Sequence, residues 1–507
     1  MSAHCGYITT LKNVRKHPKA DKLLLAKCFG NTVCVNLNYY EGQVGIYFPT
    51  DLQLSEEFCT QHNLIRKKDE NGVNIGGYMD PEKRNVTAIK LRGEKSDGLF
   101  MPISCLDYCF DKGTAADNLA VGDTIDVVNG HLICEKYIPK NASRTSAGGA
   151  GTRAHRRAKR SIAPTFFEHA DTEQLAYNLA AFKPGDLVEI TLKMHGTSQR
   201  TGYLKVFKGY KYKNFIEKWF AEGALKAEKA NGGKMMPWDE KIYNWIMDRA
   251  TPIYDWGYVS GTRRTVLDDF DGGFYGSNAF REAHARQFEG KLRKGETVYY
   301  EVVGFTDTGA GIMGAGNNEK LGKDFVKQYG KETIFSYGCD PQPSSVKRIG
   351  PSSVEINGVA VPSVEFETQE KLPQSDMYVY RMTSTNEDGE VVEYTPDFMR
   401  YRCEQMGVKC VPVFWTGFIP ENPASADDPT ITAGEWIMNK AERFYEGPDP
   451  IGKTHVREGV VARVINRPKF TAYKHKNFEF KCLSGIITDQ LDMSETANID
   501  EDILAEM

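Results

Sequence analysis

The sequence lacks the features that would place it in a membrane or hold it together with covalent links. Its 507 residues contain no run near the ~20 apolar residues of a membrane helix. The opening MSAHCGYITT lacks the charged-then-apolar order of a secretory signal. Eleven cysteines are scattered from Cys5 to Cys482 without a C-x-x-C pair, which disfavours disulfides and a structural zinc site. We expect a cytoplasmic protein with reduced thiols and no membrane contact.

The sequence also lacks a large excess of either charge. The formal net charge is -4, and the segment from Asp489 to Met507 is acidic, so a basic surface elsewhere is compatible with the total. Hydrophobic residues make up 40% and charged residues 26%, which is typical of a globular protein. The length is too great for one ordinary core and predicts two or three domains.

The local composition divides the chain into four regions. Residues 1–138 contain short runs of β-branched and aromatic residues, such as GQVGIYFP and NVTAIKLRG, bounded by turn residues, which predict a small all-β barrel. Residues 139–164 are rich in Ser, Gly and Ala and then basic, which predicts a flexible linker. Residues 165–485 alternate strand and helix patterns, and residues 486–507 form an acidic tail. The whole predicts an α+β protein.

The basic part of the linker has two possible roles. The linker carries Arg153, Arg156, Arg157, Lys159 and Arg160, which could form a solvated hinge or contact phosphates.

Helical spacing over 214–230 predicts a helix with Phe215, Trp219, Phe220 and Leu225 on one side. The mixture of Lys, Tyr and Trp from Lys205 to Trp245 fits an amphipathic surface or a site for single-stranded nucleic acid.

The stretch LKMHGTSQRTGY raises the question of whether its lysine is a catalytic nucleophile. Lys193 ends the predicted strand VEITLK, and Gly196 permits a sharp turn after it. A lysine reacts as a nucleophile only as the free amine, and nearby cations favour that form. Lys474 and Lys476 alternate in YKHKNFEFK, so on a strand both point to one face. Glu458 precedes another β-run, EGVVAR.

With GTRRT (261–265), YYEVVGF (299–305) and YVYRM (378–382) between them, these segments form an ordered set. The set resembles motifs I, Ia, III, IIIa, IV and V of the covalent nucleotidyltransferases, the ATP-dependent RNA and DNA ligases and mRNA capping enzymes. K-M-H-G-T-S at 193–198 resembles the form found in the phage RNA ligase 2 branch. The resemblance spans about residues 185–485 and implies a nucleotidyltransferase (ATP-grasp-like ligase) core of antiparallel sheets with helices.

The resemblance implies a catalytic role for three lysines. Lys193 would attack the α-phosphate of ATP and form a lysyl-AMP phosphoramidate. Lys474 and Lys476 would bind that phosphate and offset its charge. Glu458 would hold the catalytic Mg²⁺ or Mn²⁺. His195 would position the site and not transfer a proton.

The remaining matched residues would bind the nucleotide. Arg263 or Arg264 would contact the ribose or phosphates, and the sequence does not separate the two. Glu301 would hold a ribose hydroxyl, and Tyr380 would stack on adenine. Gly196 belongs to the same nucleotide site. Where the phage branch carries an adenine-reading glutamate, this chain has Leu192, so the adenine contact stays unassigned.

The front of the chain carries a second resemblance. HPKADKLLLAKCFG (17–30) and IKLRGEKSDGLFMPIS (89–104) are similar to the OB-fold tRNA-binding domain appended to some aminoacyl-tRNA synthetases. An N-terminal OB module also occurs in a Deinococcus type of RNA ligase. The resemblance implies RNA binding, although a scaffolding barrel without RNA contact is the alternative.

Together these observations predict an ATP-dependent RNA ligase, of the EC 6.5.1.3 type, that joins 3′-OH and 5′-phosphate ends. The expected partner is nicked or broken RNA, with tRNA and DNA-containing nicks both open, and the protein is expected to be a monomer. It would act in the cytoplasm, or in a host's cytoplasm if the protein is viral. A DNA ligase or capping enzyme, and a non-catalytic RNA- or tRNA-binding protein, are the competing interpretations.

Overall fold

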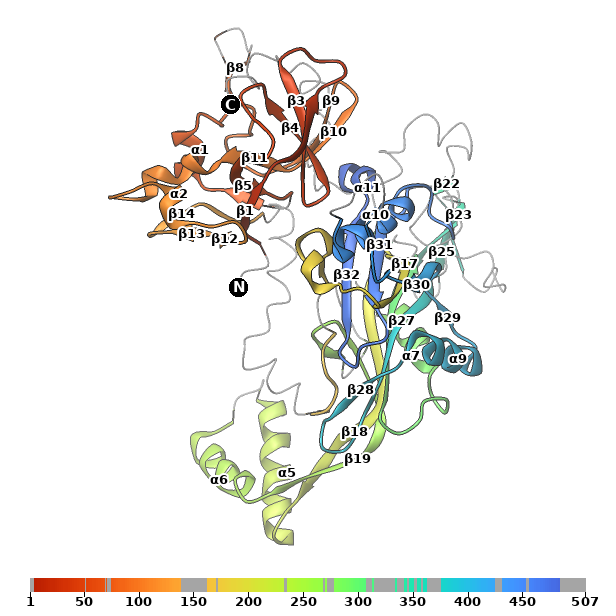
Figure 1. Ribbon diagram of the computed structural model, residues 1–507. Helices are drawn as coiled ribbons and strands as arrows, with labels where there is room; N and C mark the ends of the chain where they lie inside the picture. Colours follow the sequence, from red (N-terminus) through yellow and green to blue (C-terminus); the bar gives the residue numbers. More distant parts are fainter. Residues whose placement is uncertain are drawn as a thin grey trace.

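The protein has a mixed α+β architecture built mainly from antiparallel sheets, as the sequence predicts (Figure 1). The computed structural model describes residues 4–50, 52–68, 70, 74–137, 162–169, 172–231, 235–267, 270, 278–306, 312–313, 333–334, 342–343, 346–350, 353–356, 359–362, 375–424, 431–452 and 456–483. The tail predicted at 486–507, and all of the linker predicted at 139–164 except 162–164, lie outside these residues. No helix among them has the length and hydropathy needed to cross a membrane.

The N-terminal module, residues 4–137, contains two main sheets and several two-stranded ones. The four-stranded sheet has the order β11 (Leu99–Pro102), β5 (Val44–Phe48), β1 (Gly6–Thr10) and β12 (Thr124–Ile125). The three-stranded sheet contains β2 (Lys12–Lys16), β3 (Leu23–Cys28) and β4 (Asn31–Asn36). Neither sheet closes on itself within the described residues. The expectation of an all-β module was incomplete, because it also contains the short helices α1 (Glu56–Gln61) and α2 (Ala115–Asn118).

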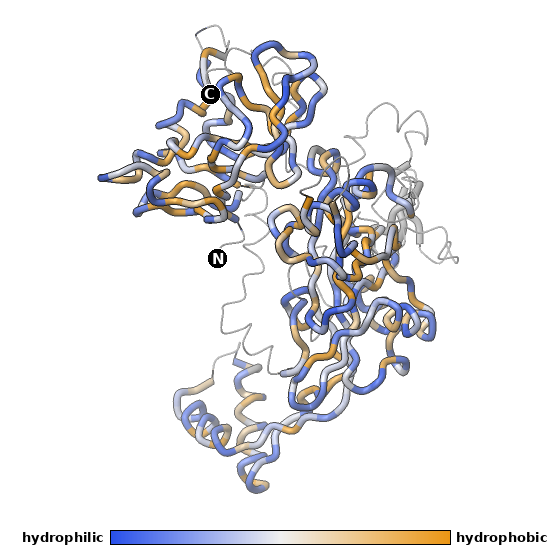
Figure 2. Tube along the Cα trace, viewed as in Figure 1, coloured by the Kyte–Doolittle hydropathy of each residue, from blue (hydrophilic) through white to orange (hydrophobic). Residues whose placement is uncertain are grey.

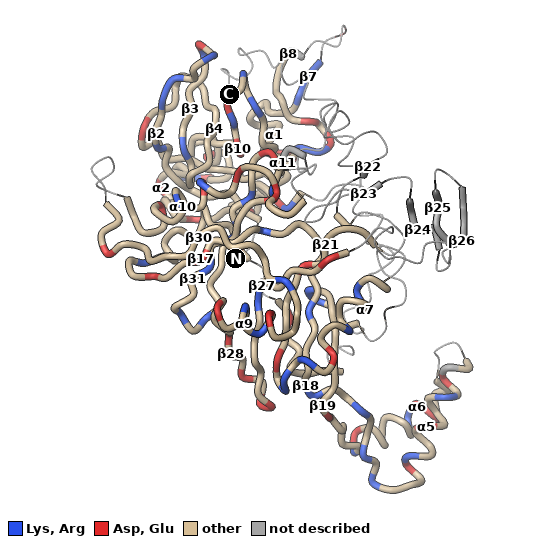
Figure 3. The backbone as a smooth tube through the Cα atoms, turned by 90° about the vertical axis from the view of Figure 1, so that its right-hand side faces the viewer, with Lys and Arg blue, Asp and Glu red and all other residues tan. Residues whose placement is uncertain are grey.

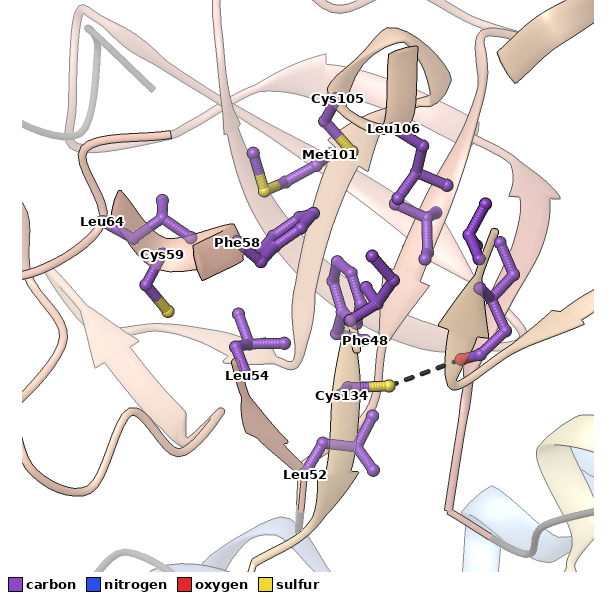
Figure 4. Close-up of a cluster of buried hydrophobic side chains, with 14 of the residues drawn as sticks. Phe48, Leu52, Leu54, Phe58, Cys59, Leu64, Met101, Cys105, Leu106 and Cys134 are labelled. Carbon is purple, nitrogen blue, oxygen red and sulfur yellow. Dashed lines mark hydrogen bonds between the residues drawn. The ribbon is translucent and has the colours of Figure 1, made fainter. Parts of the chain in front are cut away.

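Helix α1 forms where local signals support it and covers the core of the module. The Ser55 side chain accepts the backbone N–H of Phe58, and two glutamates occupy the first turn, where the helix dipole favours negative charge. Its Phe58 packs against Phe48 with ring centroids 5.3 Å apart. Figure 4 shows these rings among aliphatic and sulfur-containing side chains from the surrounding strands. The buried cluster is therefore ordinary core packing.

The two segments that resemble a tRNA-binding domain lie against each other. Nε2 of the buried His17 hydrogen bonds the carbonyl of Leu91 at 3.1 Å, and its Nδ1 accepts the backbone N–H of Lys19 at 3.1 Å. Arg92 donates to the Lys19 carbonyl at 3.4 Å. These motif residues therefore hold two turns of the module together.

The second domain contains two main sheets. Its described residues also form a two-stranded sheet of β22 (Thr333–Ile334) and β23 (Gln342–Pro343) and a three-stranded sheet of β24 (Val346–Gly350), β25 (Ser353–Ile356) and β26 (Val359–Pro362). The five-stranded sheet has the order β16 (Glu173–Gln174), β32 (Thr471–Lys476), β31 (Gly459–Val464), β17 (Leu187–Leu192) and β30 (Val413–Phe418). The larger sheet has the order β20 (Val266–Leu267), β19 (Thr251–Thr262), β18 (Thr197–Lys211), β21 (Glu296–Gly304), β27 (Ser375–Thr385) and β28 (Val391–Glu393), with β29 (Lys409–Cys410) beside β27. The chain crosses from one sheet to the other between Leu192 and Thr197.

Helices cover the outer faces of both sheets. Helix α10 (Ala433–Tyr445) begins with a capping box in which Thr432 and Glu435 exchange hydrogen bonds, and it buries Ile437 against the five-stranded sheet. Helices α7 (Ala279–Arg286) and α9 (Pro396–Met406) pack on the larger sheet. Helix α9 ends at Gly407, whose φ of +70° suits a residue without a side chain.

The outer halves of β18 and β19 project from the domain and carry α5 (Phe215–Ala230) and α6 (Pro237–Met247) (Figures 1 and 2). We call residues 205–257 the arm. The helix predicted over 214–230 is confirmed. Helix α5 buries Glu217, Ala221 and Ala224, and the two alanines allow close packing against α6. The large apolar residues that the sequence placed on one side of the helix are partly or fully exposed.

The N-terminal module packs against the second domain around helix α11 (Phe478–Leu483), which follows β32. Nζ of Lys481 lies 2.5 Å from Asp97 of the module, and both side chains are close to 10% exposed, at 12% and 10%. Lys90 pairs with Glu479 at 2.6 Å. At the other edge, Tyr7 stacks on Tyr177 with ring centroids 4.3 Å apart. The two parts therefore share a polar and aromatic interface.

The pairing of Asp97 with Lys481 predicts a measurable stability effect. Asp97→Ala leaves a buried ammonium without its partner and should lower the free energy of unfolding by about 3 kcal/mol in a urea titration. Adding Lys481→Met should recover most of the loss, because no charge then stays buried. Lys12→Ala is the control, since its exposed pair with Glu435 should contribute less than about 1 kcal/mol. Equal losses in Asp97→Ala and Lys12→Ala would contradict the assignment.

Candidate active site

Lys193 lies at the crossing between the two sheets. It directly follows β17, and its backbone N–H donates to the carbonyl of Gly459 at 3.0 Å. The preceding N–H, of Leu192, donates to Pro412 at 2.9 Å. The Lys193 side chain is 22% exposed, so the amine is held in a defined place and still reaches solvent. A reactive group in this position meets residues from both sheets.

The carboxylate of Glu458 is the centre of the charged cluster. Its Oε1 lies 2.6 Å from Nζ of Lys193 and 4.0 Å from Nζ of Lys476, and its Oε2 lies 3.3 Å from Nδ1 of His195. The side chain is only 4% exposed. Burial alone would raise the pKa of Glu458, but the neighbouring Lys193, His195 and Lys476 outweigh it and hold the pKa well below its usual range. Glu458 is therefore an ionised carboxylate surrounded by nitrogen groups.

Strand pairing explains how the two later lysines approach the cluster. Lys476 lies opposite Gly459 and Lys474 lies opposite Val461 in the β31–β32 ladder. As the alternation predicted, the buried His475 between them lies on the other face of the strand. The structure thus brings Lys193, His195, Glu458 and Lys476 together. Lys474 lies two residues further from Glu458 along the same face of β32.

Two glycines allow the backbones to approach closely at this point. A Cβ on Gly459, whose φ is +146°, would lie 2.1 Å from the carbonyl oxygen of His475. A Cβ on Gly196 would lie 2.3 Å from the carbonyl oxygen of Val302. The sequence suggested Gly196 as a turn residue, whereas its steric role is to let β21 pass beside the lysine loop.

The larger sheet supplies the opposite wall of the site. Glu301 on β21 lies across from Ser198 of β18, and the Ser198 hydroxyl is 2.9 Å from the hydroxyl of Tyr380 on β27. Burial raises the pKa of Glu301 to about 7, although Lys193, Arg263 and a hydrogen bond from the Gly196 backbone act against the rise. Burial likewise raises the pKa of the Tyr380 phenol. This wall therefore holds a carboxyl group that titrates near neutral pH.

A pocket opens between the two walls. Among the described residues that line it, Arg263 is present and Arg264 is absent, which favours Arg263 as the matched arginine. Three further predicted residues line it, Lys193, Glu301 and Tyr380. The other lining residues were not predicted as site residues: His169, Thr172, Glu189, Thr191, Leu192, Met194, Met399, Arg400, Val411, Val461, Arg463, Phe470 and Ala472.

Sequence reasoning missed a polar group further along β17. Glu189 is 3% exposed and accepts a hydrogen bond from Arg400 of α9 at 2.7 Å. Glu189, Thr191 and Lys193 line the same pocket at alternate positions. The period-two spacing of VEITLK was the available signal, because alternate residues of a strand share a face. His169 was not predicted either, and its ring lies 5.1 Å from that of Tyr380.

The donor set fits a divalent cation that is shared with a bound phosphate. Oε2 of Glu458 is buried and accepts no well-formed hydrogen bond among the described residues. No group of three His, Cys, Asp or Glu side chains gathers there or elsewhere in the described chain, so protein ligands alone do not form a closed site. Mg²⁺ commonly binds through one or two carboxylates, with substrate phosphates and water completing its shell. The cluster is compatible with that mode.

Comparisons with known proteins found similarity only among solved structures. No protein family model and no curated protein sequence matches the chain. Structures of a Naegleria gruberi RNA ligase match at 14% identity: a mutant with AMP and Mn at a TM-score of 0.48, covering 96% of this chain and 98% of that one, and a form with PPi at 0.46, covering 94% and 97%. A mutant with ATP and Mn matches at 0.46, covering 96% and 98%. A likeness of this degree establishes neither a family nor an activity.

The raised pKa of Glu301 predicts a dependence of stability on pH. The folded state favours the protonated carboxyl, so the contribution of Glu301 is complete below its ordinary pKa of 4.5 and is lost as pH rises through about 7. Glu301→Gln keeps the group neutral. The variant should therefore gain stability relative to the unsubstituted protein between about pH 5 and about pH 8, measured by urea unfolding at both. The exposed Glu82→Gln should show no such gain, and an equal gain in both would contradict the prediction.

Proposed function

We propose that the protein is an ATP-dependent RNA ligase that joins 3′-OH and 5′-phosphate ends. The observation that carries the proposal is the meeting of Lys193 with Glu458 and Lys476, where Lys193 also lines a pocket together with Glu301 and Tyr380. An amine, two carboxyl groups, a second cation and an aromatic ring are what nucleotidyl transfer to a lysine needs. RNA is assigned from the resemblance of the Lys193 segment to the RNA ligase form of motif I.

In the first step, Lys193 makes a bond to the α-phosphorus of ATP. The bond from that phosphorus to the bridging oxygen breaks, and pyrophosphate leaves. The ammonium must first leave its ion pair with Glu458 and give up a proton to solvent, which the partly exposed side chain reaches. Lys476 and Lys474 offset the charge that collects on the phosphate oxygens, because transfer at phosphorus depends mainly on positioning and charge neutralisation. When bound by Glu458, Mg²⁺ or Mn²⁺ would contribute further neutralisation of phosphate charge.

The walls of the pocket orient the nucleotide. Arg263 contacts the ribose or phosphates, Glu301 holds a ribose hydroxyl, and Tyr380 stacks on the base. His195 positions Glu458 through its Nδ1, 3.3 Å from the carboxylate. Gly196 holds the loop close to β21 and so keeps Lys193 in line with these groups.

The base end of the pocket is where this chain departs from the phage RNA ligases. Leu192 is 2% exposed and packs among apolar side chains, so it offers no hydrogen bond to a base. Thr191 and Glu189 line the pocket from the same strand, at increasing distance from Lys193. A carboxylate can accept the amino group of adenine, which guanine lacks at that position. Glu189 is therefore the residue through which we expect ATP to be preferred over GTP.

Two transfers complete the reaction. AMP passes from Lys193 to the 5′-phosphate of an RNA end, which frees the lysine and forms a new phosphoanhydride. The 3′-OH of the other end then attacks that phosphate and AMP leaves. The N-terminal module serves in this scheme as an OB-type RNA-binding domain, and nicked duplexes, tRNA and mixed RNA–DNA junctions all remain candidate substrates.

Labelling with ATP tests the nucleophile. The purified protein, incubated with α-labelled ATP and Mg²⁺ and then denatured, should carry acid-labile label. Lys193→Ala should carry none, because no other group completes the phosphoramidate. Lys183→Ala, at an exposed lysine of the same domain, should label normally. Absence of label on the unsubstituted protein, with GTP also tested, would leave the non-catalytic RNA-binding interpretation.

Titration of the metal tests Glu458. Glu458→Gln keeps the shape of the side chain and removes its charge, so the Mg²⁺ concentration for half-maximal labelling should rise by about tenfold or more. Asp397→Asn, whose carboxylate is 86% exposed on the helix that carries Arg400, should leave the titration unchanged. A Glu458→Gln variant that labels more slowly at every Mg²⁺ concentration, with the same midpoint, would argue against a metal role.

A further inference from the structure

The arm exposes aromatic side chains that its own fold does not need. In α5, Phe215 is 78% exposed and Trp219 is 68% exposed, while Ala221 and Ala224 are buried. A helix that packs for stability normally places its large apolar side chains inward. The reversed arrangement in α5 points to a surface that meets a partner.

Helix α6 repeats the pattern and adds cations. Trp238 is 76% exposed and Trp245 is 55% exposed. Lys241 lies between them at helical spacing, and the guanidinium of Arg249 lies 3.3 Å from the centroid of the Trp245 ring. Trp238, Lys241 and Trp245 of α6 and Arg249 beyond its end therefore recur at helical spacing, with Asp239, Glu240 and Asp248 between them in the sequence.

The two helices are held in place from the inside. The buried Glu217 of α5 pairs with Arg249 at the end of α6, and its backbone N–H donates to the Asn214 side chain at 2.9 Å. The aromatic rings thus lie on the outer side of an ordered helix pair. Lys and Arg positions recur along the arm, with acids among them (Figure 3).

We propose that the arm binds a single-stranded segment of the RNA substrate at a distance from the ends being joined. Bases would stack on Trp219, Trp238 and Trp245, and Lys226 and Lys241 would neutralise phosphates. The interleaving of cations with rings favours nucleic acid over a protein partner, whose interface core would be depleted of charge. The proposal rests on the proposed RNA ligase function for the identity of the RNA as substrate.

The arm is a direct continuation of the active-site strands. Strand β18 has 15 residues and begins at Thr197, four residues after Lys193, and it pairs with β19 from Gln199 to Lys211. At about 3.4 Å per residue it spans about 50 Å. A stacked strand that touches both the arm and the site covers about 15 nucleotides at about 3.4 Å each. The arm therefore selects RNA with a long strand beside the break and has no effect on short ends.

Binding measured without ATP separates this proposal from the ligase function. The probes are fluorescein-labelled single-stranded RNAs of about 24 and about 8 nucleotides, followed by anisotropy with the full chain. The triple variant Trp219→Ala/Trp238→Ala/Trp245→Ala should bind the longer RNA at least about tenfold more weakly, because each base loses a stacking partner. The short RNA cannot reach the arm and the active site together, so the preference of the unsubstituted protein for the longer RNA should be largely lost in the triple variant. The control is Phe418→Ala, which removes a 63% exposed ring from β30 and should leave both affinities unchanged.

A second variant guards against misfolding of the first. Lys226→Ala/Lys241→Ala keeps every ring and should lower the slope of log affinity against log salt by about 0.7 for each phosphate that is no longer neutralised. Lys193 labelling in both arm variants should match the unsubstituted protein, since the arm lies outside the nucleotide pocket. Loss of labelling in the unsubstituted protein would defeat the ligase proposal and leave the anisotropy result intact.

Two results would overturn the arm proposal. One is equal affinity of the unsubstituted protein and the triple variant for the longer RNA. The other is a dimer in sedimentation that becomes a monomer in the triple variant with RNA binding unchanged, which would assign the exposed rings to a contact between two copies of the chain.

Discussion

The buried carboxylate of Glu458 contacts or lies close to three nitrogen groups from two other segments of the chain, the loop after β17 and the end of β32. Lys193 follows β17, His195 lies two residues later, and Lys476 ends β32. A buried charge is tolerated only where such partners surround it, so the cluster constrains how these segments meet. The same carboxylate holds the lysine that we propose as the nucleophile. The ion pair that stabilises the site in this structure is thus also the one that must open for the reaction.

The charged cluster and the residues of the opposite wall come from different sheets. The five-stranded sheet contributes the charged groups, Lys193, Glu458 and Lys476, while the larger sheet contributes Glu301 and Tyr380. Gly459 lets β31 lie close to β32, and Gly196 lets the lysine loop lie close to β21, at distances that a Cβ would forbid. The groups that we propose to face the nucleotide and those that we propose to face its phosphates therefore come from different sheets.

The site is also linked to the N-terminal module. Helix α11 follows Lys476, its Phe480 packs against the ring of His195 at 4.8 Å, and its Lys481 pairs with Asp97 of the module. Strand β18 extends in the other direction from the same loop to the arm. The lysine loop thus lies between a docked module on one side and, on the other, a projecting helix pair with exposed aromatic residues.

The sequence by itself determined the α+β class, the short-strand character of the N-terminal module, and which residues were candidates for the site. The class and the strands follow from local rules, since strand alternation places Lys474 and Lys476 on one face and turn residues bound each strand. The candidate site residues are those that the resemblance to the nucleotidyltransferase motifs implies. Only the tertiary structure decided that Arg263 and not Arg264 lines the pocket, that Glu189 lies in it, and that α5 buries alanines and exposes Trp219. Those outcomes depend on contacts between segments that are distant in the chain. The sequence pattern of one helix or strand does not determine which other segment packs against each of its faces.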